Sequence, residues 1–214
     1  MRPAATPDAA RRGTIIATAT ILLIRHAAHG HLGAVLSGRQ EGIPLAPEGV
    51  RQAESLARRL CAEPPDAVQS SPVQRAQETA RAIAAGCGRD VETVAALDEI
   101  DFGEWTGRPF ADLDGDPEWD RWNNARSEAQ APGGESMAAA QERALAHLRD
   151  AARRHAGGTV AMVTHCDIIR AIVAAVLGLS LDRILRFDVG PATISRIAAG
   201  EWGERLVTLN EGAA

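Results

Sequence analysis

Ile21-Leu22-Leu23-Ile24-Arg25-His26 carries the strongest structural signal in the chain, because four large aliphatic residues run directly into an arginine and a histidine. A continuous apolar run that ends at a polar break predicts a strand buried on both faces, as in a parallel sheet. In open α/β sheets, ligands bind just beyond the carboxyl ends of such strands. We therefore expect Arg25 and His26 to stand at that edge, where a fixed positive charge and a titratable imidazole can act together.

A second strand of the same kind lies far downstream, where the apolar segment Thr159–Val163 runs into Thr164 and His165. Thr164 and Asp167 resemble a capping box, which predicts that a helix begins at His165. The carboxyl ends of parallel strands meet at the same edge of a sheet. The sequence therefore predicts that His26 and His165 lie close together at this edge.

The stretch Ser71–Arg75 predicts the start of another helix. Ser71 can cap it, Pro72 suits the first helical position, and Gln74 completes a capping box. Arg75 would then lie in the first turn, beside free N–H groups and the positive end of the helix dipole. An anion held between Arg75 and the helix start would resolve this unfavourable placement. The alternative is a plain surface arginine.

Strand and helix signals alternate along the chain, which predicts an α/β domain. Apolar residues recur at helical spacing after Pro47 and between Ser136 and His155. Further strands are predicted at Ala67–Ser70, Val91–Val94, Arg183–Val189, Thr193–Ala198 and Leu206–Leu209. The expected architecture is a three-layer α/β/α sandwich around a mostly parallel sheet, with the C-terminal strands at a sheet edge.

One folded domain is expected, because 214 residues with 45% hydrophobic content can bury one good core. We assign residues 1–17 to a disordered N-terminal tail and residues 18–214 to the domain. Residues 104–134 concentrate carboxylates and aromatic rings in a chain with only 3% aromatic residues. This segment is predicted to form a small cap insertion, packed by its own rings: Trp105, Phe110, Trp119 and Trp122.

The net charge and the cysteines indicate which partners this protein can bind and in which cellular compartment it works. A net charge of −5 argues against nucleic acid or an anionic membrane as a partner, and no segment approaches the length of a membrane span. Cys61, Cys87 and Cys166 form no CxxC pair, which fits reduced thiols better than disulfides or a zinc site. The N-terminal segment lacks a signal-peptide pattern, so we expect a cytoplasmic protein.

Two arginines and two histidines at one sheet edge suit the binding and transfer of a phosphoryl group. Arg25 and Arg75 present fork-shaped donors that match phosphate oxygens, and helix starts add backbone N–H groups. A neutral imidazole can attack phosphorus, and a second imidazole can donate to the developing charge. The acid-rich loop Leu97–Gly107 supplies carboxyl groups for the leaving alkoxide. Such a cage acts by positioning and electrostatics and needs no metal.

Four stretches occur in a fixed order: the strand into Arg25-His26, the segment Ser70–Ala80, the loop Leu97–Gly107, and Thr164-His165. In this order they resemble the histidine phosphatase superfamily, the phosphoglycerate mutase-like group, over roughly residues 20–199. The resemblance implies the phosphoglycerate mutase-like fold and a phosphohistidine formed on His26.

The same resemblance implies the roles of the other site residues. It assigns Arg25, Arg75 and His165 to the phosphate pocket, and it makes Glu99 the proton donor to the leaving group. Glu99 would then deprotonate the water that hydrolyses the phosphohistidine. No metal and no other cofactor is implied.

This chain departs from the family pattern after the first histidine. The family usually continues with Gly, then Glu or Gln, then Thr or Ser, with an Asn nearby, whereas this chain reads Ala27-Ala28-His29-Gly30-His31. We expect Arg39 to replace the missing phosphate contact, and His29 and His31 to be solvated loop residues. Cys166 stands where the family commonly has Gly, and its larger side chain leaves less space in the site beside His165.

The segment between Glu99 and Ser136 resembles that of the broad-specificity phosphatases and is shorter than in glycolytic mutases. An acidic, Trp-rich cap is also a poor place for the extra negative charge of a bisphosphate. We therefore predict hydrolysis of a small phosphorylated metabolite whose alcohol part is partly apolar or aromatic. The alternative within the family is phosphoglycerate mutase-type phosphoryl transfer.

Two alternatives lie outside this activity. A metallohydrolase could use His26, His29, His31 and His165 as ligands, although their spacing is weak evidence for a metal site. The altered loop after His26 could instead mark an inactive relative that only binds phosphorylated ligands or a partner protein. A homodimer could form through the edge strand near the C-terminus.

Overall fold

The computed structural model describes residues 17–212, in which β1 (Ala19–Arg25) lies inside a six-stranded sheet of order β3-β2-β4-β1-β5-β6. The other strands are β2 (Ala67–Ser70), β3 (Val91–Thr93), β4 (Thr159–Thr164), β5 (Ile194–Gly200) and β6 (Gly203–Glu211). β1, β2, β3 and β4 are parallel, whereas β5 and β6 are antiparallel to their neighbours. The predicted α/β fold with a mostly parallel sheet is confirmed. The N-terminal tail expected at residues 1–17 falls outside the described residues, except for Ala17.

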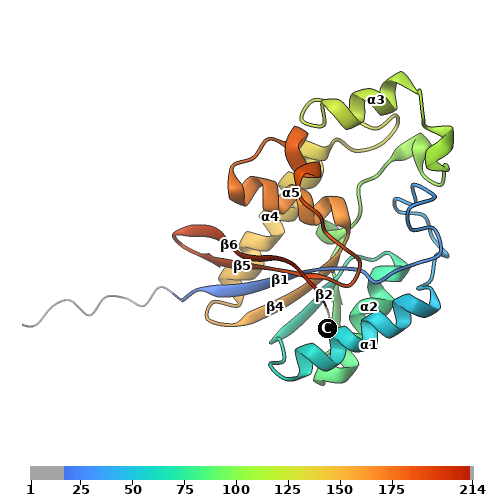
Figure 1. The fold of residues 1–214 in the computed structure, drawn as a ribbon. Helices are drawn as coiled ribbons and strands as arrows, with labels where there is room; N and C mark the ends of the chain where they lie inside the picture. The colour runs from blue at the N-terminus through green and yellow to red at the C-terminus, as the bar shows by residue number, and fades with distance from the viewer. Residues whose placement is uncertain (1–16, 213–214) are drawn as a thin grey trace, which may run out of the picture.

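Helices cover both faces of this sheet (Figure 1), as the pattern of β1 requires. Ile21 and Leu23 are fully buried in the core on one face, and Leu22 and Ile24 are buried in the core on the other. The first core is closed by α4 (Met137–Arg154) and α5 (Cys166–Leu177), the second by α1 (Pro47–Cys61) and α2 (Gln74–Cys87). Alternate side chains of one apolar run thus hold three layers together.

Residues 104–134 extend one end of the molecule beyond the sheet, as Figure 1 shows around α3. This segment begins within η2 (Gly103–Trp105) and contains the short helix η3 (Phe110–Asp112) and α3 (Pro117–Asn124). Its rings pack edge to face, with centroids 5.2 Å apart for Trp105 and Trp119 and 6.0 Å apart for Trp105 and Trp122. These rings belong to the same buried core as α4 and α5, so the cap is continuous with the main core.

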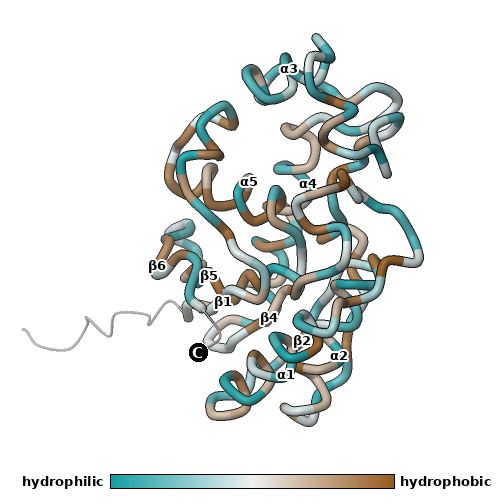
Figure 2. Tube along the Cα trace, turned by 45° about the vertical axis from the view of Figure 1, so that its right-hand side comes forward, coloured by the Kyte–Doolittle hydropathy of each residue, from teal (hydrophilic) through white to brown (hydrophobic). Residues whose placement is uncertain are grey.

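Hydropathy follows this arrangement. Figure 2 shows hydrophobic residues along α5 and mostly hydrophilic residues along α3. In α5 six residues are buried, whereas α3 buries only Trp122. Within residues 17–212, no helix combines the length and the apolar character needed to cross a bilayer.

Three sequence-based expectations about the elements were wrong. Arg183–Val189 is not a strand, because Leu181–Arg186 forms a 3₁₀ helix that packs against α5. Ser71 does not cap a helix at Pro72, since α2 begins at Gln74 and has no side-chain cap. Thr164 does not complete a capping box either, because its hydroxyl donates to the Leu97 carbonyl at 2.6 Å.

The three cysteines are free thiols, yet two of them meet in space. Cys61 ends α1 and Cys87 ends α2, and their Sγ atoms lie 3.7 Å apart. A Cβ atom at Gly86 would lie 3.0 Å from the Cys61 sulfur, so this glycine permits the close approach of the two helix ends.

Candidate active site

A cavity of about 550 Å³ opens where β1, β2 and β4 end. Its inner wall consists of Arg25, His26, Arg75, Glu99 and Cys166. The backbone N–H of His26 donates to the Thr164 carbonyl at 2.9 Å, which keeps the ends of β1 and β4 together. As predicted from the two strand ends, the rings of His26 and His165 then lie with centroids 5.1 Å apart.

The imidazole of His26 is buried and held in one tautomer. Its Nδ1 lies 2.9 Å from the Ala27 carbonyl oxygen, which can only accept, so Nδ1 carries the hydrogen. Nε2 therefore keeps its lone pair, and the Arg75 Nε donates to it at 3.2 Å. Burial, and next the positive charge of Arg75, hold the pKa of His26 well below its usual value. A neutral imidazole whose Nε2 carries a lone pair and no proton is the nucleophilic form.

Arg75 is the second residue of α2 and lies in its first turn, but the alternative of a plain surface arginine is excluded because only 2% of the residue is exposed. One Nη donates to the Gly38 carbonyl at 2.7 Å and to His165 Nδ1 at 3.3 Å. The other Nη is buried and has no hydrogen-bond partner among residues 17–212. An unpaired buried guanidinium nitrogen is costly, and a phosphate oxygen in the cavity would satisfy it.

His165 is fully buried and receives its orientation from the segment after β2. Because Arg75 can only donate to Nδ1, the hydrogen of the neutral ring lies on Nε2, which is 2.8 Å from the Ser71 hydroxyl. Ser71 in turn donates to Asp98 at 3.2 Å. The Ser71 hydroxyl also accepts from the Val73 N–H at 3.2 Å, just before α2 begins at Gln74, so it contacts the backbone ahead of the helix and not an N–H of α2 itself. Burial, followed by the charge of Arg75, lowers the pKa of His165 well below its usual value.

Glu99 lies at the start of the acid-rich loop, where one carboxylate oxygen accepts from the Ile100 N–H at 2.9 Å. The other oxygen lies 3.7 Å from His165 Nδ1. Burial, and next the negative charge of Asp167, raise the pKa of Glu99 to about 7. A carboxyl group with this pKa exists in both protonation states near neutral pH, as a residue that donates and later accepts a proton requires.

Arg25 completes the inner wall of the cavity. One Nη donates to the Val189 carbonyl at 2.6 Å, which fixes the guanidinium at the end of β1. Its Nε is buried without a hydrogen-bond partner in the described part of the chain. The structure thus brings together five of the residues predicted from the sequence: Arg25, His26, Arg75, Glu99 and His165.

Arg39, the expected substitute phosphate contact, does not line this cavity. Its Nε donates to the Glu99 carbonyl at 2.7 Å, and its guanidinium pairs with Glu135 at 3.1 Å and with Asp98 at 3.5 Å. Arg39 therefore supports the backbone of the acid-rich loop. Its charge is neutralised by carboxylates that the sequence separates from it by about 60 and 96 residues.

His29 was expected to be solvated, but only 8% of it is exposed and it lines the cavity. Its ring lies 5.2 Å from that of His26, and burial, with Arg75 next, lowers the pKa of His29 to about 4. His31 does not line the cavity. Within residues 17–212, no three His, Cys, Asp or Glu side chains are grouped so that they could hold a metal ion. The described residues therefore offer no set of metal ligands for the metallohydrolase alternative.

Arg126, which follows α3, and Arg170 on α5 are charged cavity residues that were not predicted from the sequence. Both pair with Asp167, at 3.4 Å and 3.3 Å. The spacing of Asp167 and Arg170 by three residues at a helix start was a visible signal of an ion pair. No local signal marks Arg126, because its position depends on how the cap folds back over α5.

A family model described as the histidine phosphatase superfamily (branch 1) matches residues 21–212. The chain is 32% identical over 195 residues to phosphoserine phosphatase 1 of Hydrogenobacter thermophilus, covering 89% of this chain and 91% of the relative. It is 29% identical over 181 residues to a probable phosphoglycerate mutase of Yersinia pestis, covering 83% of each chain.

A solved structure is similar as well. Phosphoserine phosphatase of Entamoeba histolytica, crystallised as a mutant with phosphoserine, superposes with a TM-score of 0.81 at 25% identity, covering 90% of this chain and 96% of that chain. The matched family model covers the strand ends that carry His26 and His165 and the loop that carries Glu99. The chain belongs to branch 1 of the histidine phosphatase superfamily.

Proposed function

We propose that this protein hydrolyses small phosphomonoesters through a phosphohistidine formed on His26. The observation that carries the proposal is the state of His26 Nε2, whose lone pair faces Arg75 while Nδ1 is fixed by a backbone carbonyl. Arg25 and Arg75 line the same cavity, and each has a guanidinium nitrogen without a hydrogen-bond partner among residues 17–212. Nucleophile and anion-binding groups therefore coincide, as phosphoryl transfer requires.

In the first step, His26 Nε2 attacks phosphorus and the bond from phosphorus to the alkoxide oxygen breaks. Arg25 and Arg75 neutralise the charge on the transferring group, and protonated Glu99 gives its proton to the leaving oxygen. His165 Nδ1 faces both Arg75 and Glu99, which places it to donate to a phosphoryl oxygen once the dianion has raised its proton affinity.

In the second step, Glu99 accepts a proton from water as the water oxygen attacks phosphorus. The phosphorus–nitrogen bond breaks and its electron pair returns to Nε2, which releases inorganic phosphate and restores both residues. The pKa of Glu99 at about 7 serves both directions of proton transfer.

Hydrolysis is favoured over mutase chemistry, although the relatives carry names of both kinds. A mutase must hold a second phosphate and shield the phosphohistidine from water. The carboxylate of Asp167 occupies the outer cavity between Arg126 and Arg170, which leaves less positive charge there than a phosphate dianion needs. The cytoplasmic location and the homodimer expected from the edge strand β6 stay predictions.

The test is turnover of a panel of phosphomonoesters by the wild type and His26→Ala, with a chelator present. We expect phosphate release that survives the chelator and disappears in the variant, and a phosphorylated protein trapped by rapid acid quench. Phosphate release by His26→Ala would contradict the proposed intermediate. Transfer between two positions of a substrate without release of phosphate would instead establish a mutase.

A further inference from the structure

Two guanidinium groups meet over one carboxylate in the outer part of the cavity. Arg126 follows α3 in the cap, and its Nη lies 3.4 Å from one oxygen of Asp167. Arg170 lies on α5, and its Nη is 3.3 Å from the other oxygen of Asp167. All three residues line the cavity that also contains His26.

Both guanidinium groups have N–H donors without a hydrogen-bond partner among residues 17–212. Arg126 is 95% buried, since its exposed fraction is 5%, and it lies over the Trp122 ring at 5.7 Å from the centroid. Its other Nη donates to Asn123 at 2.8 Å. The Nε atoms of Arg126 and Arg170 are buried and find no hydrogen-bond partner within residues 17–212. A buried donor without a partner destabilises the protein, so an acceptor bound in this cavity would bring a net gain.

The charges around these donors do not balance. Asp167 supplies one negative charge against two positive ones. Arg170 also approaches Asp188 at 3.9 Å, but Asp188 has an exposed fraction of 93% and contributes little at that distance. Glu99, the other carboxyl group of the cavity, is largely protonated below its pKa of about 7. The outer cavity therefore carries an excess of about one positive charge, which matches a carboxylate and falls short of a phosphate dianion.

We propose that Arg126 and Arg170 bind a carboxylate on the alcohol part of the substrate, so that the substrate is a phosphorylated hydroxy acid. This inference rests on the proposed function, because the phosphate end is assigned to His26 and its cations. Phe110, Trp119 and Leu185 line the same cavity and would contact the carbon skeleton between the two anionic ends. The expectation that the cap disfavours further negative charge overlooked Arg126, which the fold brings inward from an acidic segment.

The test compares two esters that differ only in charge, 4-carboxyphenyl phosphate and 4-carbamoylphenyl phosphate. The wild type should hydrolyse the carboxylate ester with a kcat/KM about ten-fold or more above that of the carboxamide ester, as expected for one charge-assisted hydrogen bond. Arg126→Met and Arg170→Met should each lower kcat/KM on the carboxylate ester about ten-fold more than on the carboxamide ester, so that the preference disappears. Residual hydrolysis of the carboxamide ester would also show that each variant is folded.

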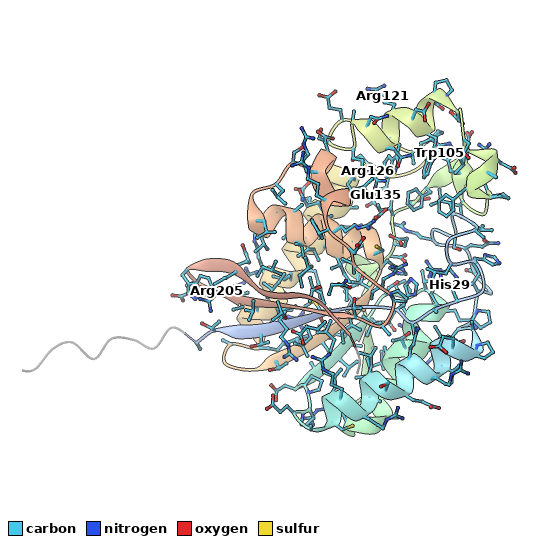
Figure 3. The ribbon with its side chains drawn as sticks, viewed as in Figure 1. His29, Trp105, Arg121, Arg126, Glu135 and Arg205 are labelled. Atoms are coloured by element: carbon cyan, nitrogen blue, oxygen red, sulfur yellow. The ribbon has the colours of Figure 1, made fainter. Side chains whose placement is uncertain are left out.

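Arg121→Met is the matched control, because Arg121 belongs to the same cap but is exposed and does not line the cavity. Figure 3 shows Arg121 on the outer side of α3 and Arg126 on its inner side. This control should keep the wild-type preference. Equal kcat/KM for both esters in the wild type, or an equal loss on both esters in Arg126→Met and Arg170→Met, would overturn the carboxylate site.

Binding to the His26→Ala variant separates this inference from the proposed function. Calorimetric titration with the same two esters should show about ten-fold tighter binding of the carboxylate ester, and Arg126→Met in the same background should abolish the difference. If the wild type hydrolyses neither ester but this binding difference persists, the hydrolase assignment is wrong and the carboxylate site stands. If hydrolysis occurs and no binding difference is found, the hydrolase assignment stands and the carboxylate site is wrong.

Discussion

The guanidinium of Arg75 links both histidines of the site to the loop that follows β1. Its nitrogens reach His26 Nε2, His165 Nδ1 and the Gly38 carbonyl, and one Nη has no hydrogen-bond partner among the described residues 17–212. Only a planar fork can make these bonds at once. The position of this one side chain therefore determines both the tautomer of His165 and the anion-binding capacity of the cavity.

Replacing Arg75 by Lys should lower kcat by about 10²- to 10³-fold, since the three donors of one ammonium nitrogen cannot serve two histidines, the Gly38 carbonyl and a phosphate oxygen together. Steady-state kinetics on an aryl phosphate measure this loss. Arg81→Lys on the exposed side of the same helix serves as the control and should behave as wild type. A loss of less than three-fold in Arg75→Lys would remove Arg75 from the phosphate site.

The raised pKa of Glu99 predicts a specific dependence on pH and on the leaving group. The acid form decreases as pH rises through about 7, so kcat on alkyl phosphates should fall above this pH. Glu99→Gln should reduce kcat/KM, which reports formation of the phosphohistidine, about 10²- to 10⁴-fold on alkyl phosphates and far less on aryl phosphates, whose phenolate leaves without a proton. Stopped assays from pH 5 to 9 on both classes give the comparison. An equal loss on both classes would contradict the assigned role.

At this scale, periodicity predicted the residues at strand ends, and the family resemblance predicted Glu99 in its loop, but Arg39 was misplaced and Arg126 was missed. Arg25, His26 and His165 directly follow apolar runs, so their place at the sheet edge follows from periodicity. Arg39 and Arg126 lie in irregular segments whose path depends on contacts with distant residues. Glu135 draws Arg39 away from the cavity, and Asp167 draws Arg126 into it.

At the scale of elements, α1 and α2 support the backbone directly after His26. The Thr79 hydroxyl on α2 accepts from the Ala27 N–H at 3.0 Å, and Gln52 on α1 accepts from the Ala28 N–H at 3.0 Å. Gly49, in the first turn of α1, lets the helix approach the Ala28 carbonyl closely. The two helices thus fix the position of the residue that carries the nucleophile.

Gly49→Ala should therefore impair both activity and stability. A Cβ atom at this position would lie 1.9 Å from the Ala28 oxygen, so the helix or the segment after His26 must move. We expect destabilisation of about 1–3 kcal/mol, measured by urea unfolding, together with a reduced kcat. Gly30→Ala, where no atom lies within 4 Å of the added Cβ, should leave both quantities close to wild type. Wild-type kcat in Gly49→Ala would show that α1 does not position the nucleophile.

Element prediction failed where a local signal was overridden by a tertiary contact. Ser71 and Thr164 both look like helix caps, yet their hydroxyls bond to His165 and to the Leu97 carbonyl. Arg183–Val189 has a mixed apolar pattern that also fits a 3₁₀ helix, in which Leu181 and Ile184 are buried against α5. The apolar runs of β1 and β4 are short and end at polar residues, and a run of this length favours a buried strand over a helix, which needs ten or more residues.

At the scale of the molecule, the cap and the sheet share one core. Trp122 in α3 is fully buried, and Phe102 and Trp105 contact its ring with centroids 5.7 Å and 6.0 Å away. The same cluster extends to α4 and α5. This continuity means that the position of Arg126, which lies over the Trp122 ring, depends on the stability of the whole domain.

Trp122→Ala should consequently destabilise the whole protein and not only the cap. Loss of a buried tryptophan ring costs about 3–5 kcal/mol, which corresponds to a fall in Tm of about 10 °C for a domain of this size. Because the core is shared, far-UV circular dichroism and the fluorescence of the remaining tryptophans should report a single transition at the same lowered Tm. Trp202→Ala is the control, since the Trp202 ring is half-exposed in the turn between β5 and β6 and its loss should shift Tm by less than about 2 °C.

Two separate transitions, or an early fluorescence change with an unshifted dichroism transition, would mean that the cap folds as an independent unit. Arg126 could then move with the cap while the phosphate site stayed intact.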